Sequence, residues 1–132
     1  MSNGKLVTTI RLAHGSKDNE KSKGYRMEET FPVEGLRPGG SIEEARVTQA
    51  VSTKVSDAVY YGGGTWDKIP YTVEIFSSVS VVCDQTPEKV LEAQNVAHQM
   101  AFESSHDSLQ KALIGHVNNI KNNLYSGYFD ED

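Results

Sequence analysis

Residues 71–93 read YTVEIFSSVSVVCDQTPEKVLEA, and this stretch contains the change from strand to helix that decides the fold. In its first half, apolar side chains occupy every second position, which is the period of a β-strand with one buried face. The residues on this apolar face are Tyr71, Val73, Ile75, Val79, Val81 and Cys83. Phe76 and Val82 interrupt the polar face. We therefore expect part of that second face to be covered as well.

Thr86 and Pro87 predict the start of a helix directly after this strand. Thr is a preferred N-cap, Pro is favoured at the first helical position, and Glu88 complements the helix dipole in the first turn. Apolar residues then recur with helical spacing as far as Leu124. The C-terminal third of the chain is therefore predicted to be helical.

The length of this helix is the difficulty. A continuous helix over 87–124 would be about 57 Å long, whereas a globular chain of this size has a radius of gyration of about 14 Å. Residues 104–107, SSHD, repeat a capping-box pattern. Either the helix kinks near Ser104 and forms two pieces, or it projects and packs on a partner subunit.

The N-terminal part of the chain predicts a hairpin. Residues 5–13 and 25–33 both alternate as half-buried strands do. The segment 14–24 between them, HGSKDNEKSKG, carries no hydrophobic residue and is bounded by polar and glycine residues. We expect it to be a long, mobile, basic connection.

The segment 42–61 allows two interpretations. Valine recurs every four residues from Val47 to Val59, a spacing close to both the helical period and a multiple of the strand period. Ser41 and Glu44 form a capping-box pattern that favours a helix. The many β-branched residues favour a strand. We predict a long strand, with a helix as the alternative, between the turn at 36–41 and the glycine-rich loop at 62–70.

The predicted fold class is therefore α+β: an antiparallel sheet of about four strands, followed by a long C-terminal helix that is either continuous or kinked. The 132 residues fit one domain, which we place at 1–129, followed by an acidic C-terminal tail at 130–132. The single cysteine excludes an internal disulfide. No apolar run approaches the length of a membrane span, and no signal peptide is evident, so we expect a cytoplasmic protein that does not contact membranes.

Enzymatic motifs are absent from the sequence. The four histidines lack zinc-binding spacing, and His98 and His106 lie too far apart on a helix to share an ion. Cys83 has no neighbouring base, and the glycines at 62–64 do not form a phosphate-binding motif. We expect a non-enzymatic protein with no metal and no cofactor.

Charge is distributed unevenly along the chain. Residues 1–26 carry a net charge of +4 within a chain of net charge −5, which favours a basic surface for an anionic partner. Aromatic residues at the predicted strand ends either pack across strands or provide platforms for stacked bases. The candidate nucleic-acid-binding residues are Arg11, Lys17, Lys21, Lys23, Tyr25, Arg26, Tyr60, Tyr61, Trp66, Lys68 and Tyr71.

Two features resemble single-stranded DNA-binding proteins. The last residues, YSGYFDED (125–132), are similar to the acidic, aromatic tails of bacterial and phage proteins of this class, although those tails end in Pro-Phe. The ββββα order resembles the whirly-type single-stranded DNA-binding proteins. The resemblance implies sequence-tolerant binding of single-stranded DNA, a homo-oligomer such as a dimer, and a tail that contacts a protein partner. The alternatives are a protein–protein interaction module (an inhibitor or adaptor) and an oligomer that sequesters a nucleotide-like ligand.

Overall fold

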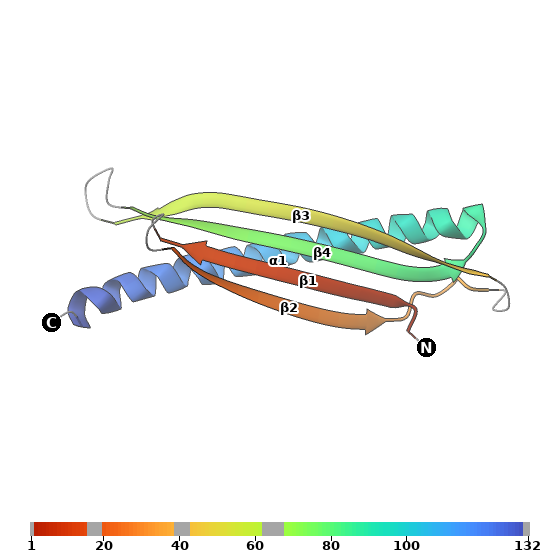
Figure 1. Cartoon of the computed structure of the whole chain (residues 1–132), viewed down its shortest axis with the longest axis horizontal. Helices are drawn as coiled ribbons and strands as arrows, with labels where there is room; N and C mark the ends of the chain where they lie inside the picture. The colour runs from red at the N-terminus through yellow and green to blue at the C-terminus, as the bar shows by residue number, and fades with distance from the viewer. Residues whose placement is uncertain (1, 16–19, 39–42, 62–67, 131–132) are drawn as a thin grey trace.

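The computed structural model describes residues 2–15, 20–38, 43–61 and 68–130, with side chains up to Asn123. Four strands precede one helix: β1 (Gly4–His14), β2 (Lys21–Phe31), β3 (Glu44–Tyr60), β4 (Lys68–Asp84) and α1 (Pro87–Asp130). The strands form one antiparallel sheet in the order β2-β1-β4-β3. Figure 1 shows α1 running along one face of this elongated sheet. The predicted α+β class and the strand order along the chain are confirmed.

The strand interpretation of 42–61 is confirmed, and the helical alternative is wrong. β3 pairs with β4 over its whole length, from Glu44 opposite Asp84 to Tyr60 opposite Lys68. Two strands begin three or four residues earlier than predicted. β2 begins at Lys21 and not at residue 25, and β4 begins at Lys68 and not at Tyr71. Residues 21–24, which we expected to belong to the connection, extend the ladder of β2 without apolar side chains, because strand pairing is made by the backbone. In β4, Ile69 of the added segment packs against the second apolar cluster.

The expected kink near Ser104 is absent, because α1 is one continuous helix of 44 residues. The helix is about 66 Å long and follows an equally elongated sheet, since β3 and β4 each have 17 residues and span about 56 Å at the strand rise. The radius of gyration expected for a compact globule therefore sets no limit on the length of this helix. Ser104 and Ser105 face the sheet and bond to Thr8 of β1 (3.4 Å) and Thr53 of β3 (3.0 Å), so they are not caps.

The predicted start of the helix is confirmed. The amide of Lys89 donates a hydrogen bond to the Thr86 hydroxyl at 3.3 Å, as expected for an N-cap. The helix then presents small residues to the sheet at every fourth position, and all of them are buried: Ala93, Ala97, Ala101 and Ser105. Small side chains allow the helix backbone to approach β4 closely.

Two apolar clusters lie between α1 and the sheet. One contains Val79, Val81 and Ala97, and the other contains Val73, Ile75 and Ile120. Buried Thr8, Ser77 and Ser105 separate them as a polar band. The opposite sheet face is open around Phe76, which is 47% exposed, so the part of this face that is covered does not include Phe76. Val82 is half-buried, and its backbone bonds to Asn3.

Candidate functional site

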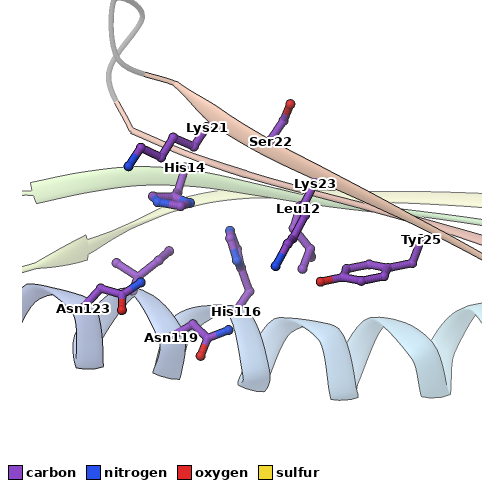
Figure 2. Close-up of a pocket in the computed structure, with 10 residues that line it drawn as sticks. Leu12, His14, Lys21, Ser22, Lys23, Tyr25, His116, Asn119 and Asn123 are labelled. Atoms are coloured by element: carbon purple, nitrogen blue, oxygen red, sulfur yellow. The ribbon is translucent and has the colours of Figure 1, made fainter.

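A cavity of about 340 Å³ lies between the β1–β2 hairpin and the C-terminal half of α1 (Figure 2). Alternate residues of β2 line it from the strand side: Lys21, Lys23 and Tyr25. Successive side chains of a strand point to opposite faces, so these three side chains share the face on which the helix lies. His14, which pairs with Lys21, lies beside them on β1.

The helix supplies the opposite wall. His116, Asn119 and Asn123 line the cavity, and their spacing of three and four residues places them on one side of the helix. Figure 2 shows the two asparagine side chains below the lysines of β2, with the His116 ring pointing toward His14. The cavity is therefore walled by segments that are about a hundred residues apart in the sequence.

The lining of the cavity is cationic. None of the residues that line it carries a carboxylate, although the chain as a whole has a net charge of −5. Within the described ranges, Lys21 and Lys23 form no ion pair, and the Lys23 ammonium lies 6.0 Å from the centre of the Tyr25 ring. A concave surface with one sign of charge concentrates ligands of the opposite charge.

Two histidines connect the strands to the helix beneath these lysines. The His116 ring is buried and lies edge-on to the rings of His14 (5.5 Å between centres) and Tyr71 (5.9 Å). Burial, and secondarily the neighbouring His116 and Lys21, lower the pKa of His14 from its ordinary value of 6.5. His14 is therefore mainly neutral at pH 7, and the positive charge of the cavity comes from the lysines.

This set of groups is suited to binding a ligand that is anionic and partly aromatic. Ammonium groups bind phosphate, amide side chains offer both donors and acceptors, and an exposed tyrosine offers a face for stacking. Over the described part of the chain, no group of three or more histidine, cysteine or acidic residues is arranged to hold a metal ion.

The structure brings together three of the candidate residues, Lys21, Lys23 and Tyr25. Arg11 and Arg26 lie on the opposite sheet face, because they alternate with the residues that face the helix. Arg26 also pairs with Glu28 at 2.8 Å.

The aromatic candidates are dispersed. Tyr71 is buried against His116, and Tyr60, Tyr61 and Lys68 are exposed where β3 ends and β4 begins. The candidates Lys17 and Trp66 and the tail residues 131–132 lie outside the described ranges. Helix α1 continues through Asp130, six residues beyond Leu124, where the predicted apolar spacing ends.

Sequence reasoning missed the helix half of the cavity. His116, Asn119 and Asn123 were not candidate binding residues, and neither was His14 on β1. His116 is buried. The sequence did contain a signal for this wall: the polar residues His116, Asn119 and Asn123 lie on the same side of the helix as the apolar residue Ile120.

No family model, curated protein or solved structure matches this chain. None of the helical residues that the structure describes forms a segment long and apolar enough to cross a membrane.

Proposed function

We propose that this protein binds single-stranded DNA without catalysing a reaction, and that one nucleotide unit occupies the cavity between β2 and α1. The observation that carries the proposal is the cavity itself. It combines two lysines, an aromatic ring and two amides, with no carboxylate, in a protein that is otherwise acidic.

Each group has a role in this proposal. Lys21 and Lys23 contact phosphate oxygens, and Tyr25 stacks on a base, since its ring is 46% exposed. Asn119 and Asn123 offer hydrogen bonds to the base edge from the other wall. The cavity volume of about 340 Å³ is at the lower end of the range of small-ligand sites, roughly 300–1,000 Å³, which suits one nucleotide and not several.

A fluorescence titration with a labelled oligothymidylate at 50 and 200 mM salt tests the proposal. Each phosphate contact contributes about −0.7 to the slope of log affinity against log salt. Replacing Lys21 and Lys23 by alanine together should reduce the magnitude of the slope by about 1.4. The matched control is the double replacement of Lys54 and Lys89, which pair with Glu74 and Glu92 away from the cavity. The control removes the same charge and should leave the slope unchanged. Absence of binding by the wild type at 50 mM salt and micromolar protein would refute the proposal.

The second candidate function is sequestration of a free nucleotide-like ligand. The concave shape of the site favours it, because small ligands bind preferentially in concave sites. A mononucleotide that binds as tightly as the oligothymidylate would establish this alternative. Tighter binding of longer oligonucleotides would support the proposed function.

A further inference from the structure

The two edges of the sheet differ in how they are protected. Edge strands expose unpaired backbone groups, and charged side chains discourage pairing with another strand. Five of the 11 residues of β2 are charged, but only four of the 17 residues of β3. Residues 47–53 of β3, VTQAVST, carry no charge. Among the described residues, no strand pairs with the outer edge of β3.

The side chains of β3 are arranged symmetrically about Thr53. Val47, Val51, Val55 and Val59 alternate with polar residues on the face that packs against α1. In an antiparallel pair of two copies of β3 aligned on Thr53, Val51 lies opposite Val55 and Val47 opposite Val59. Each of these contacts occurs twice, once on either side of the two-fold axis that passes between the two Thr53 residues. Directly opposed β-branched residues stabilise antiparallel pairing.

The charged residues of β3 are compatible with the same register. Lys54 lies opposite Ser52 on the open face of the sheet, and Asp57 lies opposite Gln49 on the helix face. Arg46 lies opposite Tyr60. No two charges of the same sign are directly opposed, so directly opposed residues do not repel each other in this register.

Helix α1 leaves apolar side chains on the side nearest this edge. Ser104 bonds to β1 and Ser105 bonds to β3, so α1 lies over β4 at this point, with its Ser105 side toward the edge. Phe102 lies about 60° around the helix from Ser105, on the side away from Ser104. Its side chain is 58% exposed, as is that of Leu91, which projects in a similar direction.

We propose that the protein is a two-fold symmetric dimer in which β3 pairs antiparallel with β3 of a second copy, aligned on Thr53. The two sheets then form one continuous eight-stranded sheet, with both helices on the same face. The helix axes lie three strand spacings apart, about 14 Å. Phe102 from each copy projects into the space between the helices. The dimer is independent of the proposed DNA binding, because the cavity lies at the β2 side of the sheet.

Charge variants at one exposed position test the register. Ser52→Lys places a lysine opposite Lys54 of the second copy at two equivalent positions, and should raise the dimer dissociation constant by roughly tenfold. Ser52→Glu adds a charge of opposite sign at the same position and should leave the dimer intact. Ser52→Lys combined with Lys54→Glu should restore it. Light scattering over a concentration series measures the mass, expected at twice the 14.5 kDa of the chain.

Cross-linking tests the alignment directly. Residue 50 lies opposite residue 56 of the second copy, and both Ala50 and Ser56 are exposed. A mixture of Ala50→Cys and Ser56→Cys chains should form a disulfide-linked heterodimer under mild oxidation, whereas neither variant alone should do so efficiently. Native Cys83 is buried and does not interfere.

Two results would overturn the proposal. The first is a mass of 14.5 kDa at all concentrations up to about 100 µM. The second is a dimer that Ser52→Lys does not weaken and in which the mixed cysteine variants do not cross-link, because such a dimer uses another surface. Neither result bears on the oligonucleotide titration, so failure of the dimer and failure of the DNA-binding proposal are distinguishable.

Discussion

The His116 ring on α1 donates a hydrogen bond from Nε2 to the carbonyl oxygen of Ala13 at 2.9 Å, joining residues 103 positions apart in the sequence. The contact attaches the C-terminal half of the helix to the end of β1, directly beneath the cavity. It also determines the tautomer of His116, because a carbonyl oxygen only accepts hydrogen bonds.

Loss of this hydrogen bond should destabilise the fold. We expect His116→Ala to lower the free energy of unfolding by about 1–3 kcal/mol, because the hydrogen bond to Ala13 is lost and a buried space is left. Urea unfolding followed by circular dichroism measures the change. His98→Ala, at an exposed position of the same helix, is the control and should change stability by less than about 0.5 kcal/mol. Equal stabilities for the two variants would contradict the structural role of His116.

The stability of the protein should depend on the protonation of His14. Its pKa in the folded protein lies below the ordinary value of 6.5, so the unfolded chain takes up the proton first. Stability is therefore retained above about pH 6.5 and is lost as the pH falls through the folded pKa. The titratable groups around His14 are His116, Lys21, Glu20 and Asp57. Urea midpoints between pH 7.5 and 5 should fall less for His14→Asn than for the wild type, and parallel curves would contradict this prediction.

Tyr25 should contribute to DNA affinity through stacking. Tyr25→Ala should weaken oligothymidylate binding by about 1–3 kcal/mol with an unchanged salt slope, because stacking releases no counterions. Tyr25→Phe keeps the ring and should bind nearly as well as the wild type. Tyr60→Ala, which removes an exposed tyrosine remote from the cavity, is the matched control. A loss of affinity in Tyr60→Ala equal to that in Tyr25→Ala would mean that the cavity is not the stacking site.

Cys83 should be unreactive in the native protein. Burial, and secondarily Asp84, raise the pKa of its thiol, whereas Arg37 lowers it. Both the low accessibility and the small thiolate fraction slow its reaction with a thiol reagent. We expect labelling at pH 8 only after denaturation, with Ser56→Cys as an exposed control that reacts at once. Fast labelling of native Cys83 would show that the face of β4 assigned to the core is wrong.

Replacement by alanine should affect the stability of the protein differently at Ser77 and at Ser105, two buried serines at the centre of the core. The Ser77 hydroxyl is buried and has no hydrogen-bond partner within the described residues, so Ser77→Ala should leave stability unchanged or raise it by up to about 1 kcal/mol. Ser105→Ala removes the bond to Thr53 and should cost about 1 kcal/mol. Urea unfolding of the two variants compares them. A larger loss for Ser77→Ala than for Ser105→Ala would contradict the hydrogen-bond assignment.

The sequence predicted correctly those elements that are marked by a residue pattern within one short segment. The alternation after Tyr71 and the cap at Thr86 were sufficient to place β4 and the start of α1. The β-branched residues were sufficient for β3. The interpretation of Ser104 as a break failed because the length of the helix depends on the length of the sheet beneath it. That sheet extends to residues such as Lys21 and Lys68, whose side chains carry no strand signal.

The sequence by itself determined the order of elements, the buried face of β4, the single unpaired cysteine and the excess of positive charge near the N-terminus. Each of these follows from side-chain type and spacing within one segment. Only the tertiary structure decided that Lys21 and Lys23 share a cavity with Asn119 and Asn123, while Arg11 and Arg26 face the other way. That choice depends on the order of strands in the sheet and on the face that the helix covers. Both are set by packing between residues far apart in the chain, which no local pattern records.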